Sequence, residues 1–73
     1  MEDDKDLDYI ALIVGANPGR FQMLELMLYL VDSPETALPI GDAARLIREA
    51  EGRGLIKEMN MALLGDNWRY YPS

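Results

Sequence analysis

The fold of this chain is decided by one stretch, Gly54-Leu55-Ile56-Lys57-Glu58-Met59-Asn60-Met61-Ala62-Leu63-Leu64-Gly65-Asp66-Asn67-Trp68-Arg69-Tyr70-Tyr71-Pro72. Strand-forming residues on both sides of a glycine are typical of a β-hairpin. A type II′ turn needs a positive φ at its first central residue, and Gly65-Asp66 meets this requirement. The opposite residues are then Leu63 with Trp68, Met61 with Tyr70 and Met59 with Pro72, while Asn60 faces Tyr71 and Ala62 faces Arg69. One face of the predicted hairpin is apolar, so we expect it to pack through that face.

The residues ahead of the hairpin predict three helices. Apolar residues at helical spacing predict a first helix over residues 6–14. Asn17 and the proline after it suit the start of a second helix over residues 18–31. Apolar side chains surround most of the axis of that helix, which predicts either a buried central helix or an interface. A third helix is expected over residues 43–53, and residues 38–40 are expected to form a short third strand. The residues expected to face inward in the third helix are Ala43, Leu46, Ile47 and Ala50.

These elements predict an α+β fold of three helices followed by a C-terminal β-hairpin, winged-helix-like in its order. We interpret residues 1–73 as a single small domain with an acidic N-terminal segment at residues 1–6. A chain of this size buries only about 60% of its unfolded surface, so its stability is expected to be modest. We expect a monomer or a weak dimer.

The third helix and wing of winged-helix transcription regulators resemble two stretches of this chain, Ala43-Ala44-Arg45-Leu46-Ile47-Arg48-Glu49-Ala50-Glu51-Gly52-Arg53-Gly54-Leu55-Ile56 and Gly65-Asp66-Asn67-Trp68-Arg69-Tyr70-Tyr71-Pro72. In that family the third helix enters the major groove of DNA, and the wing contacts the backbone or the minor groove. The resemblance therefore implies four DNA contacts, namely Arg45, Arg48, Lys57 and Arg69. Together with Arg53 they form the predicted DNA-binding residues of the alternative function.

The charge of the chain favours a different partner. The net charge is −6, and all of it lies in residues 1–39, because acidic and basic residues are equal in number over residues 40–73. DNA-binding domains gain much of their affinity by neutralising phosphates, whereas an acidic chain suits a basic protein surface. The predicted protein-binding residues are Asp3, Asp4, Asp6 and Asp8, with Tyr71 as an exposed aromatic anchor. Small acidic phage-encoded regulators that bind host RNA polymerase resemble this chain in size, charge and lack of cysteine.

Each candidate set also has a purely structural interpretation. The arginines of the third helix alternate with acidic residues and could form a solvated face. The acidic residues at the start of the chain could be a frayed, solubilising tail. Tyr71 could simply pack within the hairpin. Asp42 is interpreted as the cap of the third helix.

An enzyme is not expected, because the chain has no histidine, no cysteine and only two serines. No nucleophile and base can be paired from these residues, so we predict no catalytic residue. The same composition predicts no metal site and no cofactor. No apolar run approaches the roughly 20 residues that span a membrane, and the acidic start does not suit a signal peptide. We therefore expect a cytoplasmic protein, in the host cytoplasm if a phage encodes it.

The function expected from these features is non-enzymatic transcription regulation by protein–protein interaction. The expected partner is a basic protein surface, with host RNA polymerase as the candidate, and binding would inhibit initiation or modify termination. The alternative is a DNA-binding winged-helix repressor.

Overall fold

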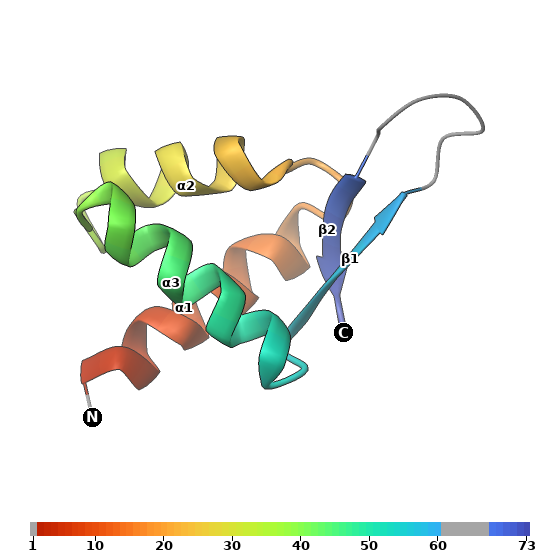
Figure 1. Ribbon diagram of the computed structural model, residues 1–73, viewed down its shortest axis with the longest axis horizontal. Helices are drawn as coiled ribbons and strands as arrows, with labels where there is room; N and C mark the ends of the chain where they lie inside the picture. The colour runs from red at the N-terminus through yellow and green to blue at the C-terminus, as the bar shows by residue number, and fades with distance from the viewer. Residues whose placement is uncertain (1, 61–67) are drawn as a thin grey trace.

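The computed structural model describes residues 2–60 and 68–73, with side chains from residue 4 of the first helix onward. The elements in this part of the chain are α1 (Glu2–Ala16), α2 (Met23–Asp32), α3 (Ile40–Gly52), β1 (Ile56–Asn60) and β2 (Trp68–Pro72) (Figure 1). Three helices are thus followed by an antiparallel pair of strands, which confirms the predicted α+β fold class. The turn predicted at Gly65-Asp66 lies outside the described residues.

The first helix is longer than predicted. It begins at Glu2 rather than at residue 6, because carboxylates in a first turn interact favourably with the helix dipole and extend the helix beyond its apolar residues. Asn17 ends this helix instead of capping the next one. Its side-chain amide donates to the Ile13 carbonyl at 2.9 Å, and its backbone N–H donates to the same oxygen at 3.1 Å. The predicted cap of the second helix therefore belongs to the end of α1.

The second helix begins later than predicted, at Met23. Gly19 has a φ of 76°, a left-handed conformation that interrupts any helix starting at residue 18. The backbone N–H of Gln22 donates to the Glu25 carboxylate at 3.2 Å, as in a capping box. The start of α2 is therefore set by Gln22 and Glu25, and not by the proline.

The two sides of α2 differ in exposure. Leu26 and Leu30 are fully buried, whereas Leu24 is 61% exposed, Leu28 46% and Tyr29 40%. The prediction that this helix is buried on nearly every side is therefore wrong. The apolar residues that do not reach the core form an exposed side of α2.

The third helix begins at Ile40, directly after Pro39. Residues 38–40 consequently form no strand, so the predicted third strand is wrong. Pro39 lacks a backbone N–H, but the start of a helix does not need one, so α3 can begin directly after it. Asp42 lies inside the first turn rather than at the cap, so the predicted cap is also wrong. The four residues expected to face inward are buried, as predicted: Ala43, Leu46, Ile47 and Ala50.

A glycine-dependent turn joins α3 to β1. Gly54 has a φ of 74°, and its N–H donates to the Glu51 carbonyl at 3.0 Å. The N–H of Leu55 donates to the Ala50 carbonyl at 2.9 Å. This pair of bonds is a Schellman motif, which ends the helix and redirects the chain.

The register of the two strands differs from the prediction. Met59 lies opposite Arg69 rather than Pro72, a shift of three residues that moves its side chain to the other face. Burial accounts for this register. Ile56 and Tyr70 are 2% and 0% exposed and share the inner face of the sheet. The opposite residues are Ile56 with Pro72, Lys57 with Tyr71, Glu58 with Tyr70, Met59 with Arg69 and Asn60 with Trp68.

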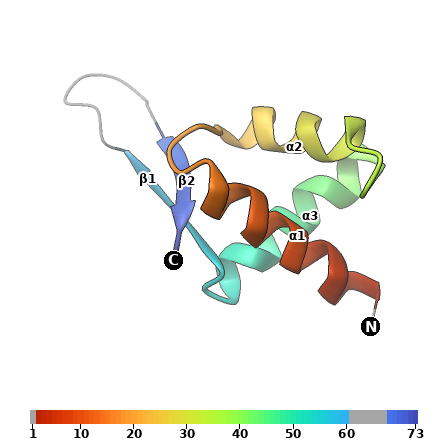
Figure 2. The same ribbon diagram turned by 180° about the vertical axis from the view of Figure 1, so that it is seen from behind.

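The free edge of β2 is covered by the segment between α1 and α2. The Gly19 N–H donates to the Tyr70 carbonyl, and the Tyr70 N–H donates to the Phe21 carbonyl, each at 2.9 Å. Figure 2 shows this segment passing beside β2, with α1 lying across α3. Both α1 and α2 contact α3, and their buried side chains form one core cluster with Ile56 and Tyr70. Residues 19–21 thus lie beside the strand pair, where residues 38–40 were predicted to form a third strand.

Candidate interaction surfaces

The predicted acidic site lies on the first turns of α1. Asp4 and Asp8 are exposed and four residues apart, so they lie on the same side of the helix. Asp6 is partly buried. The side chain of Asp3 falls outside the part of the chain that the structure describes. Two of the predicted carboxylates therefore form one line on a formed helix rather than on a frayed tail.

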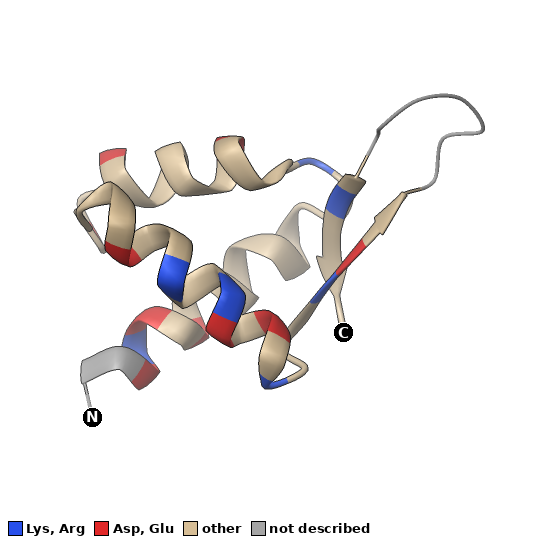
Figure 3. Ribbon diagram, in the orientation of Figure 1, with Lys and Arg blue, Asp and Glu red and all other residues tan. Residues whose placement is uncertain are grey.

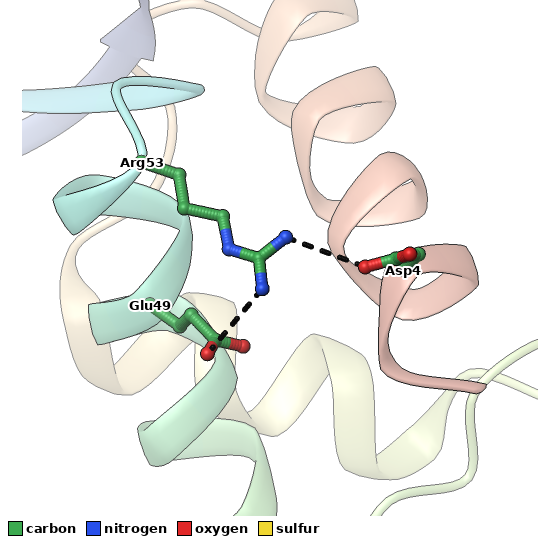
Figure 4. A network of polar contacts seen from close by, with 3 residues as sticks. All are labelled: Asp4, Glu49 and Arg53. Carbon is green, nitrogen blue, oxygen red and sulfur yellow. Dashed lines mark hydrogen bonds and ion pairs between the residues drawn. The ribbon is translucent and has the colours of Figure 1, made fainter. Parts of the chain in front are cut away.

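An arginine connects this helix to the end of α3 (Figure 4). The Arg53 Nη1 atom lies 3.3 Å from Asp4 Oδ1, and its Nη2 atom lies 3.7 Å from Glu49 Oε1. The side chains of Arg53 and Asp4 are about half exposed, and exposed ion pairs are worth roughly 0.2–1 kcal/mol. Arg53, one of the predicted DNA-binding residues, is thus engaged within the protein.

Tyr71 is separated from the acidic residues. Its ring is partly buried against Gly19, beyond the C-terminal end of α1. The carboxylates lie near the opposite end of this 15-residue helix, which is about 22 Å long. The structure therefore does not bring Tyr71 and the acidic residues into one site.

Two of the predicted DNA contacts lie on the outer side of α3. Arg45 and Arg48 are exposed, and Figure 3 shows basic and acidic residues interspersed along this helix. Asp42 precedes the two arginines and Glu51 follows them. The field of this face is consequently mixed in sign.

The two remaining predicted contacts lie on the sheet. Lys57 and Arg69 share the face of the sheet opposite to Tyr70. Lys57 is exposed, whereas Arg69 is partly buried and donates from Nη1 to the Trp68 carbonyl at 3.3 Å. The five predicted DNA contacts are therefore divided between α3, its C-terminal turn and the sheet.

A buried tyrosine joins the sheet to α3. The Tyr70 side chain is fully buried, and its hydroxyl donates to Glu51 Oε1 at 3.1 Å. Burial, reinforced by the charges of Glu51 and Glu58, raises the pKa of Tyr70 well above its ordinary range. Burial also raises the pKa of Glu58, with a smaller contribution from the charge of Glu51. The negative charges of Glu51 and Glu58 thus repel each other where β1 follows α3.

A second polar network links α1 to the loop after α2. The Ser33 hydroxyl donates to Glu35 Oε2 at 2.6 Å, and its oxygen lies 3.0 Å from the Tyr9 hydroxyl. The Tyr9 hydroxyl also lies 3.4 Å from the same Glu35 oxygen. The hydrogen bond from Ser33 is the main reason that the pKa of Glu35 is lowered. These bonds fix Tyr9 against the loop.

Tyr9 divides two adjoining hollows of about 300 and 350 Å³, which also share Glu35 as a wall. The first hollow extends to Leu12 on α1, and the second extends to Tyr29 and Pro34. We call these two hollows together the Tyr9 groove. Its apolar walls come from α1, the end of α2 and the loop that follows.

The sequence did not predict the Tyr9 groove. Tyr9 and Ser33 are 24 residues apart, and Tyr9 and Glu35 are 26 apart, so no local spacing connects them. The available signal was Leu12, an apolar residue whose position on α1 lies on the side of Asp8 and away from Leu7 and Ile10.

Comparisons with known proteins identify no relative of this chain. No family model, no curated protein and no solved structure matches the chain. Over residues 2–60 and 68–73, no helix is both long and apolar enough to cross a membrane. The same residues include no group of three or more acidic side chains placed to hold a metal ion.

Proposed function

We propose that this protein is a non-enzymatic transcription regulator that acts by binding a basic surface of another protein. Host RNA polymerase is the proposed partner, because small acidic phage-encoded regulators resemble the chain in size, charge and lack of cysteine. Binding blocks or displaces another factor, and so inhibits initiation or modifies termination. In this proposal the protein acts in the host cytoplasm as a monomer or weak dimer.

The observation that carries this proposal is the acidic side of α1. Asp4 and Asp8 lie on the exposed side of a formed helix, and Arg53 contacts Asp4 at 3.3 Å. A preformed helix presents its charges with little ordering on binding, which favours affinity. The net charge of −6 adds long-range attraction to a basic surface and speeds the encounter.

The arrangement of the body supports its interpretation as winged-helix-like. An amphipathic third helix ends in a glycine turn and leads into an antiparallel pair of strands. In this proposal α3 and the strands act mainly as a compact scaffold. The mixed charge of α3 and the ion pairs of Arg53 support that role over DNA reading.

A DNA-binding winged-helix repressor is the second candidate function. It is favoured by Arg45 and Arg48, which are exposed three residues apart on α3. The exposed Leu24 and Leu28 of α2 would supply the dimer contact in that case. Such a repressor should shift DNA at low salt, and the double variant Arg45→Ala, Arg48→Ala should abolish the shift.

Fluorescence anisotropy of the labelled protein with purified bacterial RNA polymerase tests the first candidate. The double variant Asp4→Asn, Asp8→Asn should weaken binding by about tenfold or more. The control variant Asp42→Asn, Glu58→Gln removes the same charge from α3 and β1, and it should change the affinity by less than about twofold. Equal losses in the two variants, or no binding of the wild-type protein, would exclude this candidate.

A further inference from the structure

Two aromatic walls of the Tyr9 groove, Tyr9 and Tyr29, are held in place by contacts within the protein. Leu12 is 66% exposed in one hollow, and Tyr29 is 40% exposed in the other. The ring of Tyr29 packs edge-on against Phe21, with centroids 5.4 Å apart and planes at 66°. Tyr9 is held by its contacts with Ser33 and Glu35. Because these walls need little rearrangement, apolar surface buried on them contributes directly to affinity.

The charges around the groove select the kind of occupant. Its lining includes the carboxylates of Asp6, Asp8, Asp32 and Glu35. Among the described lining residues, the basic side chain is that of Lys5. An apolar occupant with basic flanks is therefore complementary, whereas acidic segments are repelled. A second copy of this chain is a poor occupant, because it would bring the same acidic rim and another net charge of −6.

We propose that the Tyr9 groove binds a basic segment of a partner protein, with an apolar side chain against Leu12 and Tyr9 and flanking lysines or arginines facing the carboxylates. The proposal rests on the proposed function in taking the partner to be a protein. It adds where that partner binds and what its segment contains. It also gives Asp8 a specific role, since Asp8 lines the groove and lies on the exposed side of α1.

Selection of a random library of short displayed peptides on the full chain tests this proposal. The enriched peptides should combine lysine or arginine with leucine, phenylalanine or tryptophan. Synthetic versions should then be titrated against the protein by fluorescence anisotropy. Chemical-shift changes on binding should centre on Tyr9, Leu12 and Glu35.

Two matched pairs of variants locate the binding. Leu12→Gln should raise the Kd of the selected peptides by about tenfold or more, because it removes an apolar wall. Leu24→Gln changes a similarly exposed leucine on α2, and it should change the Kd by less than about twofold. Asp8→Asn should weaken binding more than Asp42→Asn does. No enrichment, enrichment of acidic peptides, or equal effects within either pair would overturn the proposal.

The polymerase experiment separates this inference from the proposed function. Peptides that bind at the groove while RNA polymerase does not bind would retain the inference and exclude the polymerase as partner. Polymerase binding that Leu12→Gln leaves unchanged, together with no basic peptides selected, would exclude the groove and retain the function.

Discussion

A Cβ atom added to Gly19 would lie 3.0 Å from the Tyr71 hydroxyl oxygen, because the tyrosine ring packs directly against the glycine backbone. Gly19 also has a φ of 76°, which residues with a side chain rarely adopt. These two constraints hold the segment between α1 and α2 beside β2. The contact therefore joins the helices to the sheet.

Gly19→Ala should lower the free energy of unfolding by roughly 1–3 kcal/mol, from backbone strain and the clash together. Urea denaturation measures this loss. The control is Gly41→Ala, since no atom lies within 4 Å of the added Cβ and residue 41 is helical. That change should be neutral or stabilising by up to about 1 kcal/mol. Equal effects of the two variants would contradict the packing of Tyr71 on Gly19.

Tyr70 should make the protein sensitive to alkaline pH. The folded state raises the pKa of Tyr70. The folded protein therefore still holds the phenol proton at a pH where the unfolded chain has released it. The stability from this group is present below the ordinary tyrosine pKa of about 10 and is lost as the pH rises above it. Unfolding free energies measured from pH 8 to about 11.5 should therefore fall less steeply in Tyr70→Phe. The same slope in both proteins would refute this role.

Glu58 should oppose folding slightly at neutral pH. The folded state raises the pKa of Glu58. The contribution of Glu58 to stability is therefore most favourable below the ordinary glutamate pKa, and it is lost as the pH rises through the pKa of the folded state. Glu58→Gln should stabilise the protein at pH 7 by about 0.5 kcal/mol or less, because solvent screens this partly exposed group. The advantage should shrink towards pH 4.

Asp42→Asn is the contrasting variant for Glu58→Gln. Asp42 lies in the first turn of α3, where a negative charge interacts favourably with the helix dipole. Its replacement should therefore destabilise the protein by roughly 0.3–1 kcal/mol at neutral pH. Thermal or urea unfolding of both variants at pH 7 measures the opposite signs. Stabilisation by Asp42→Asn, or destabilisation by Glu58→Gln, would contradict these environments.

Arg53→Ala should loosen the start of α1. The change removes the contacts with Asp4 and Glu49, and it should lower the unfolding free energy by roughly 0.2–1 kcal/mol, less at high salt. Amide hydrogen exchange should quicken in the first turns of α1 and stay unchanged in α2. Unchanged exchange near Asp4 would show that the ion pair does not hold this end of the helix.

The sequence predicts local periodicity better than long-range pairing. The inward side of α3 was predicted correctly because Ala43, Leu46, Ile47 and Ala50 follow helical spacing within one element. The strand register was wrong because the alternation of side chains permits more than one pairing. The burial of Tyr70 against the helices decides between them. That burial depends on residues 19–21, whose contact with β2 no local pattern encodes.

The same distinction applies to the candidate sites. The acidic residues of α1 could be named from composition and charge alone. Their separate surroundings could not be predicted in this way, because Asp4 contacts Arg53 at the C-terminal end of α3 while Asp8 lines the Tyr9 groove. The groove depends on the meeting of Tyr9 with Ser33 and Glu35. Only the packing of α1 beside the loop after α2 brings these residues together.

If the acidic helix α1 and the groove beside it bind a basic protein, that protein should shield them from solvent. Hydrogen–deuterium exchange of the full chain, alone and with excess purified bacterial RNA polymerase, measures this shielding. We expect slower exchange in residues 2–16 and 33–35, and little change in α3. Protection confined to α3 and the strands, or no protection by the polymerase, would contradict it.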